Sequence, residues 1–193
     1  MAFFKDRLAV VIGKHGVTKN LLEQQTGTHI IIDSNTGEYQ IKPNMEIKFP
    51  EENQEFQDPN IRVYTTQSIL NAINYGFNPQ KALKLLDAEM IFELINLEQI
   101  LGHSPKKLKR MKGRLIGDQG KFRQDLEKFA CVNISIYDKY IALIGEFDSI
   151  KIAKKAINMI LQGAPHKTVI NYLHNEYQKK KQEEFTEMWK PTI

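Results

Sequence analysis

The sequence predicts an α+β protein in which one unit occurs twice. Each copy is expected to be a three-stranded antiparallel sheet packed on three helices, and one further helix is expected at the C-terminus. Three observations lead to this fold class. A segment of the chain repeats itself, the hydrophobic spacing changes from helical to alternating inside each repeat, and a long amphipathic stretch follows the second repeat. The 193 residues leave room for two small domains of this kind.

The repeat relates residues 10–33 to residues 114–137 at a constant offset of 104 positions, without a gap. A Gly-x-x-Gly segment recurs, together with one leucine and three isoleucines around it. The matched pairs are Ile12 and Ile116, Gly13 and Gly117, Gly16 and Gly120, Leu22 and Leu126, Ile30 and Ile134, and Ile32 and Ile136. A run of six matches that includes both glycines indicates a duplicated unit.

Both copies predict the same order of elements. Helical spacing of apolar residues follows the second glycine, and alternation then takes over: Ile30 and Ile32 share one face of a strand, and Ile31 lies on the other. A turn and a second strand follow, and helical spacing returns at residues 69–73 and 150–161. Each copy therefore reads helix, Gly-x-x-Gly, helix, strand, strand, helix.

A strand ahead of the first helix would complete each sheet. Residues 90–95 are apolar enough to supply it in the second copy. In the first copy only residues 2–4 are available, so we expect that edge strand to be short or missing.

These elements suggest domain boundaries. The first domain is expected at residues 1–78 and contains an acidic loop with prolines at residues 42–60. A linker helix at residues 79–89 joins it to the second domain at residues 90–165, and a basic amphipathic helix occupies residues 166–193.

Charge is distributed unevenly between the two halves of the chain. Residues 1–80 hold 7 Lys or Arg and 9 Asp or Glu, a net charge of −2, whereas residues 81–193 hold 20 and 14, a net charge of +6. Eight basic residues fall between Lys106 and Arg123, with only Asp118 opposing them. Such a concentration around a glycine loop favours a polyanionic partner over an ordinary solvated helix face.

The Gly-x-x-Gly loop has the properties of an anion-binding site. Glycines at both ends let the backbone adopt left-handed torsion angles and approach a ligand closely. The amides of the loop and of the following helix N-terminus are unpaired donors that carry the partial positive charge of the helix dipole, so they suit a phosphate group. A single Gly-x-x-Gly often only separates two helices, but two copies in matched surroundings favour binding.

These segments carry a resemblance to a known family. Residues 11–16 and 113–121 resemble the signature of type I KH domains, whose loop clamps the backbone of about four nucleotides beside a groove for the bases. Over nearly its whole length the chain resembles the archaeal two-KH-domain proteins of small-subunit rRNA processing, relatives of the eukaryotic "partner of Nob" family. The most specific similarities are at residues 74–83, 112–114 and 163–169.

The resemblance implies which residues would bind RNA. Two groups of four would form the backbone clamps: Gly13, Lys14, His15 and Gly16, and Gly117, Asp118, Gln119 and Gly120. Nearby cations would add phosphate contacts: Lys112, Arg114, Lys121 and Arg123. Four isoleucines would line or support the base grooves: Ile12, Ile30, Ile116 and Ile134. Because Asp118 repels phosphate, the second clamp must rely on amides and surrounding cations.

The resemblance also implies partners. The partners would be single-stranded RNA from the 3′ region of 16S rRNA, a Nob-type endonuclease that trims this region, and the α subunit of translation initiation factor 2. We expect a cytoplasmic location, because the single Cys131 cannot form an internal disulfide and so fits a reducing compartment.

Other chemistry finds no support in the sequence. The five histidines form no His-Glu-x-x-His array, there is no cysteine cluster, and neither loop ends in the Lys-Ser/Thr of a nucleotide-binding loop. We therefore expect no enzyme activity, no metal and no cofactor. No run of about 18 apolar residues is present, so we expect no membrane span.

Two alternatives to this function stay open. In the first, the chain is an adaptor between proteins and only the second KH domain binds RNA, because the first is acidic. In the second, it is a nuclease or modifying enzyme, although the sequence shows no set of catalytic residues that would support this.

Overall fold

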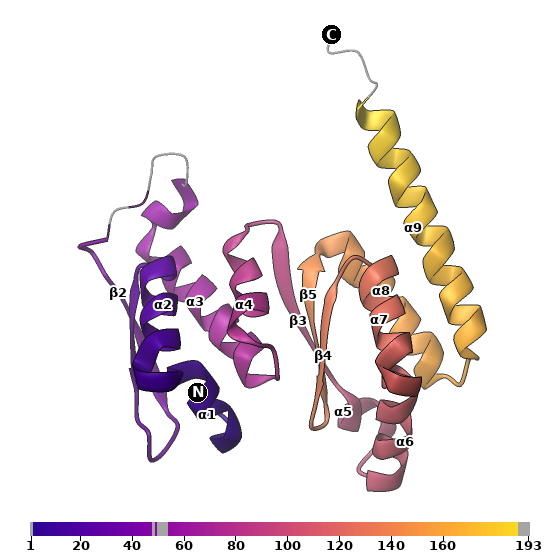
Figure 1. The fold of residues 1–193 in the computed structure, drawn as a ribbon, viewed down its shortest axis with the longest axis horizontal. Helices are drawn as coiled ribbons and strands as arrows, with labels where there is room; N and C mark the ends of the chain where they lie inside the picture. The colour runs from indigo at the N-terminus through magenta and orange to yellow at the C-terminus, as the bar shows by residue number, and fades with distance from the viewer. Residues whose placement is uncertain (1, 48, 50–53, 189–193) are drawn as a thin grey trace. The chain divides into compact units, whose positions relative to one another are not determined.

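The computed structural model describes residues 2–47, 49 and 54–188, and the chain divides into two compact units, Met1–Phe92 and Glu93–Ile193 (Figure 1). Both units combine helices with an antiparallel sheet, which confirms the α+β class. Within each, the elements around the Gly-x-x-Gly loop follow the order that the repeat predicts.

The first unit holds the following elements. Its helices are α1 (Lys5–Ile12), α2 (Val17–Thr26), α3 (Pro59–Asn74) and the short α4 (Pro79–Ala82), with 3-10 turns η1 (Lys14–Gly16), η2 (Gln54–Gln57) and η3 (Leu83–Leu86). Its strands are β1 (Thr28–Ile32) and β2 (Tyr39–Pro43), which pair antiparallel with Ile30 opposite Ile41. The expected edge strand is reduced to a single bridge between Ala2 and Glu38, as its short length predicts.

Helix α3 begins inside the segment predicted as the acidic loop of residues 42–60. Asp58 caps it by accepting a hydrogen bond from the Asn60 amide at 2.8 Å, and Pro59 takes the first turn, where its missing amide is not needed. Residues 48 and 50–53 of the predicted loop lie outside the described residues.

The second unit contains a complete sheet. Its strands are β3 (Met90–Asn96), β4 (Asn133–Tyr137) and β5 (Tyr140–Glu146), in the order β3-β5-β4 with Ile134 opposite Leu143. Its helices are α5 (Leu97–Leu101), α6 (Pro105–Ile116), α7 (Lys121–Phe129), α8 (Phe147–Leu161) and α9 (His166–Met188), with the 3-10 turn η4 (Asp118–Gly120) between α6 and α7.

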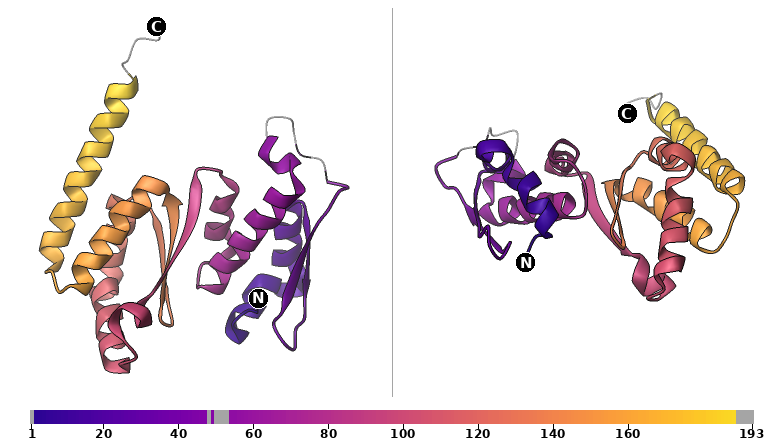
Figure 2. Two further views of the ribbon diagram at one scale, coloured as in Figure 1. Left: turned by 180° about the vertical axis from the view of Figure 1, so that it is seen from behind. Right: turned by 60° about the horizontal axis from the view of Figure 1, so that its bottom comes forward.

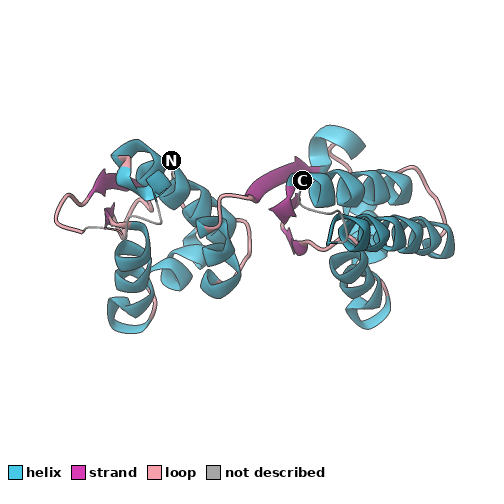
Figure 3. Cartoon of the chain, turned by 90° about the horizontal axis from the view of Figure 1, so that it is seen from above, coloured by secondary structure: helices cyan, strands magenta, loops and turns pink. Residues whose placement is uncertain are grey.

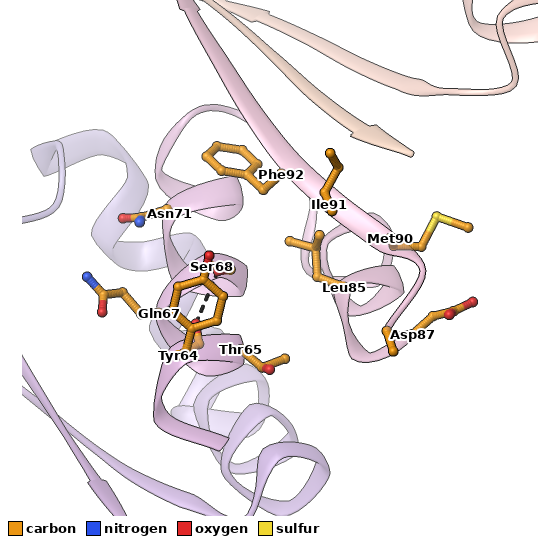
Figure 4. A pocket seen from close by; sticks show the side chains of 11 residues that line it. Tyr64, Thr65, Gln67, Ser68, Asn71, Leu85, Asp87, Met90, Ile91 and Phe92 are labelled. Atoms are coloured by element: carbon orange, nitrogen blue, oxygen red, sulfur yellow. Dashed lines mark hydrogen bonds between the residues drawn. The ribbon is translucent and has the colours of Figure 1, made fainter. Parts of the chain in front are cut away.

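Helices α6, α7 and α8 cover one face of this sheet, and α9 packs against α7 and α8 on the side away from the strands (Figures 2 and 3). Val169 and Leu173 of α9 are fully buried there, and Lys180 forms an ion pair with Glu146 at 2.7 Å. The amphipathic helix predicted after the second domain is therefore present up to Met188, and residues 189–193 lie outside the described residues.

The core of each unit uses the residues that the periodicity selects. Leu22 and Ile30 are fully buried in the first unit, and their repeats Leu126 and Ile134 are 2% and 4% exposed in the second. None of the helices in the described part of the chain is long and apolar enough to cross a membrane.

Candidate nucleic-acid interface

The two Gly-x-x-Gly loops have the same backbone conformation. Gly13 has φ 73° and ψ 174°, and Gly117 has φ 75° and ψ −179°. The third loop residue is left-handed in both, with φ 53° at His15 and 46° at Gln119. The duplication inferred from the sequence therefore preserves the backbone geometry of the loop.

The two glycines of a loop have different roles. A Cβ on Gly117 would lie 2.6 Å from Cβ of Phe122 and 2.9 Å from its backbone nitrogen, so this glycine lets the loop pack against α7. A Cβ on Gly120 would meet no atom within 4 Å, although its φ of 78° is left-handed. The second glycine therefore presents open backbone to the solvent, where a ligand can approach.

Backbone amides of the loops are available for an anion. The amides of the two glycines donate to Ala9 and Gly13 in the first loop and to Gly113 and Gly117 in the second. Among the hydrogen bonds of the described residues, none uses the amides of the two inner residues of either loop as donors. These amides precede α2 and α7, where the helix dipole adds positive potential.

The side chains of both loops are open to solvent. Lys14 and His15 are exposed in the first loop, and Asp118 and Gln119 are exposed in the second. Of the neighbouring cations, Lys121 is exposed, whereas Arg123 is half-buried with its Nε 3.9 Å from Glu127.

The isoleucines predicted for the base grooves divide into two kinds. Ile30 and Ile134 are core residues, with 0% and 4% of their surface exposed. Ile116 is 38% exposed directly before the second loop, and Ile12 is half-buried before the first. Of the four, only the two that precede a loop keep a substantial exposed surface.

Arg114, expected to contact phosphate, is engaged inside the second unit. Its guanidinium donates to the carbonyl oxygen of Ile160 in the last turn of α8 at 3.0 Å and to that of Ala164 just beyond the helix at 2.6 Å. Arg7 does the same in the first unit, donating to Ile73 and Phe77 at the end of α3. These arginines satisfy helix C-terminal carbonyls, so we propose that Arg114 holds the end of α8 rather than a phosphate.

Lys112 also forms a hydrogen bond within its unit: its Nζ donates to the carbonyl oxygen of Asp138 at 2.8 Å. This contact joins α6 to the turn between β4 and β5. In the same turn, Lys139 forms an ion pair with Glu98, and the pKa of Glu98 is lowered by hydrogen bonds from Lys139 and His103.

Replacing Arg114 by Gln should therefore lower stability rather than phosphate affinity. Loss of the two charged hydrogen bonds is expected to reduce the free energy of unfolding by about 2 to 3 kcal/mol, measured by urea denaturation. The slope of log affinity for RNA against log salt should stay unchanged at a temperature where the variant is folded. A slope reduced by about 0.7 would instead restore Arg114 as a phosphate contact.

A pair of glutamates was missed by the sequence analysis. Glu23 accepts a hydrogen bond from the amide of Ile30 at 2.6 Å, and Glu127 accepts one from Ile134 at 3.0 Å. In each unit the bonded amide points away from the paired strand, because residues alternate in direction along an antiparallel ladder. The offset of 104 relates both glutamates and both isoleucines, and this signal could have found the contact.

The surfaces beside the two loops differ in polarity. Val17, Leu21 and Ile31 of the first unit are 65%, 39% and 51% exposed. The offset replaces them in the second unit with polar residues: Lys121, Asp125 and Ser135. Among the described residues there is no group of His, Cys, Asp and Glu that could hold a metal ion.

Comparisons with known proteins agree with this geometry. The family model for the second KH domain of PNO1, described as a eukaryotic-type, type I KH domain, matches residues 91–178. A KH domain-containing protein of Methanocaldococcus jannaschii is 37% identical over 186 residues, which cover 96% of this chain and 76% of that protein. The pre-rRNA-processing protein PNO1 of Coccidioides immitis is 26% identical over 100 residues, which cover 51% of this chain and 39% of that protein.

A solved structure matches both units together. Dim2p from Pyrococcus horikoshii, crystallised in a complex with a/eIF2alpha and rRNA, has a TM-score of 0.82 and 37% identity, covering 93% of each chain. The structure of the same protein described without partners gives a TM-score of 0.79 and 39% identity, covering 91% of this chain and 96% of that one. The chain therefore belongs to the PNO1 and Dim2 family of KH-domain proteins.

Proposed function

We propose that this chain is an RNA-binding protein of pre-rRNA processing that holds single-stranded RNA at its Gly-x-x-Gly loops and performs no catalytic step. One observation carries the proposal: both loops present unpaired amides at a helix N-terminus, and a second open glycine lets a sugar–phosphate backbone approach. Two relatives support it: the pre-rRNA-processing protein PNO1 and a Dim2p crystallised with rRNA.

The proposed target is the 3′ region of 16S rRNA. The proposed protein partners are the α subunit of translation initiation factor 2, which occurs with Dim2p in the complex from Pyrococcus horikoshii, and a Nob-type endonuclease, which the family resemblance suggests. The proposed KH domains are residues 1–78 and 90–165.

Within the second unit, we assign the RNA contacts to the loop and its flanks: Ile116, Gly117, Asp118, Gln119, Gly120, Lys121 and Arg123. In the first unit the corresponding contacts are Gly13, Lys14, His15 and Gly16. The second loop should contribute most of the affinity, because Lys121 is exposed beside it and the segment around it is basic.

A direct test compares an oligoribonucleotide from the 3′ end of 16S rRNA with one of equal length and unrelated sequence. We expect the first to bind more tightly, and its affinity to fall steeply as salt rises, because phosphate neutralisation releases counterions. Equal affinity for both RNAs would argue against the 3′ region as the target.

A second candidate function is that of an adaptor in which only the second unit binds RNA. The exposed Val17 and Leu21, one turn apart on α2 of the first unit, favour a protein contact there. Changing both Lys14 and His15 to Asp discriminates the two functions. If the chain is an adaptor, the double variant should bind RNA as the unchanged protein does. If both loops clamp RNA, the double variant should bind RNA clearly more weakly.

Replacing Gly113 tests whether the RNA lies close to the backbone of α6. It is exposed within α6, four residues before Gly117, and a Cβ there would meet no atom within 4 Å. Because Ala is favoured over Gly in a helix by about 1 kcal/mol, Gly113→Ala should raise Tm by roughly 2 to 4 °C. If RNA lies against this backbone, the same change should weaken RNA binding by roughly fivefold or more, about 1 kcal/mol.

The control for this variant is Ala9→Gly, at the equivalent position of the first unit. It should lower Tm by a similar amount. Thermal melts followed by circular dichroism and RNA titrations measure both effects, and a Gly113→Ala protein with unchanged affinity would show that the RNA does not approach α6 here.

A further inference from the structure

Helix α6 is longer than its counterpart in the first unit. It has 12 residues, whereas α1 has 8. At the offset of 104, residues 105–108 of α6 correspond to residues 1–4, which precede α1. The added turn carries Lys106 and Lys107, and Lys109 and Arg110 follow directly.

These four cations have no acidic partner. All are exposed, and within the described part of the chain none takes part in an ion pair or a side-chain hydrogen bond. Other lysines of the same unit are neutralised, as Lys139 is by Glu98 and Lys154 by Glu93. Helix α6 contains no acidic residue, so its positive charge is uncompensated locally.

Three of the four cations lead toward the second loop, and Lys107 lies beside Arg110, three residues before it on the helix. Lys106, Lys109, Arg110 and Gly113 are spaced as i, i+3, i+4 and i+7, which places them on one face of a helix. The bare backbone at Gly113 continues this face toward the second loop. From Lys106 to Ile116, the last residue of α6, the helix rises about 15 Å.

We propose that the basic face formed by Lys106, Lys107, Lys109 and Arg110 is a second phosphate-binding surface, which holds the RNA beyond the nucleotides clamped at the loop. The proposal rests on the proposed RNA binding and extends its footprint along α6. Single-stranded RNA fits this surface because its negative phosphates repeat along the strand and the cations repeat along the helix. The first unit lacks the surface, since Lys109 and Arg110 correspond to Lys5 and Asp6.

The test uses two RNAs and two quadruple variants of the full chain. One RNA has about five nucleotides, little more than the four that one loop clamps, and the other is about three times as long and extends at both ends. The first variant changes Lys106, Lys107, Lys109 and Arg110 to Gln. The control removes the same charge from exposed lysines elsewhere in the second unit: Lys151, Lys155, Lys167 and Lys179.

For the long RNA, the α6 variant should reduce the salt slope by about 2 to 3, since each phosphate contact on a single strand contributes about 0.7. The short RNA should bind as it does to the unchanged protein. An unchanged slope for the long RNA, an equal loss for both RNAs, or an equal loss in the control variant would overturn the inference. The proposed function is judged separately by Gln119→Asp, which should weaken both RNAs and would refute loop binding if it weakened neither.

Discussion

Replacing Gln119 by Asp is expected to remove most RNA binding, with a loss of about a hundredfold in affinity, which equals about 2.7 kcal/mol. Gln119 is exposed at the centre of the second loop, and Asp118 stands next to it. A second carboxylate would put two negative charges where the open amides should meet a phosphate, and such like-charge contacts cost several kcal/mol.

The change should leave the fold intact. Gln119 has φ 46°, a left-handed conformation that Asp and Asn tolerate better than most residues. Gln119→Asn is therefore the matched control, because it introduces the same shape without the charge. Fluorescence anisotropy with labelled RNA measures affinity, and thermal melting verifies the fold. If the Asp variant binds RNA as the Asn variant does, the second loop is not the clamp.

Replacing Gly117 by Ala is expected to have the largest effect on stability. The new Cβ would overlap Phe122, whose Cβ and backbone nitrogen are 2.6 and 2.9 Å away, and its φ of 75° is left-handed. Backbone and a buried phenylalanine cannot move aside cheaply. We expect a loss of about 3 kcal/mol or more in the free energy of unfolding, beyond the 1 to 2 kcal/mol that left-handed strain alone costs.

Gly120→Ala separates the cost of left-handed strain from the cost of overlap with a neighbouring side chain. Its φ of 78° carries the same strain, but its Cβ would meet no atom within 4 Å. It should cost only about 1 to 2 kcal/mol. Denaturant unfolding of both variants gives the comparison, and equal losses would mean that contact with Phe122 does not set the role of the first glycine.

The repeat made much of the fold predictable. The two loops, the helices that follow them and the strands that end each motif all appear in the structure where the offset of 104 places them. The reduced edge strand of the first unit also matches the expectation, because Ala2 forms a single bridge to Glu38 there. The early start of α3 was missed although Asp58-Pro59 is a recognised helix start, because the acidic composition of that segment suggested a loop.

The candidate site was less predictable, for a physical reason. Arg114 stands in a basic segment and so suggested a phosphate contact, yet its partners Ile160 and Ala164 are 46 and 50 residues away. Carbonyl groups at a helix end have no signature in side-chain sequence. Likewise, the burial of Ile30 and Ile134 depends on packing, which spacing alone cannot distinguish from lining a groove.

The carboxylates of Glu23 and Glu127 have a consequence for self-association. In the second unit, β4 is an edge strand of its sheet, and an edge with open amides is a template on which another chain can pair. Glu127 covers the outward amide of Ile134 and adds a negative charge beside it, and Glu23 does the same for β1. Each unit thereby makes strand addition from a second molecule at this edge less favourable.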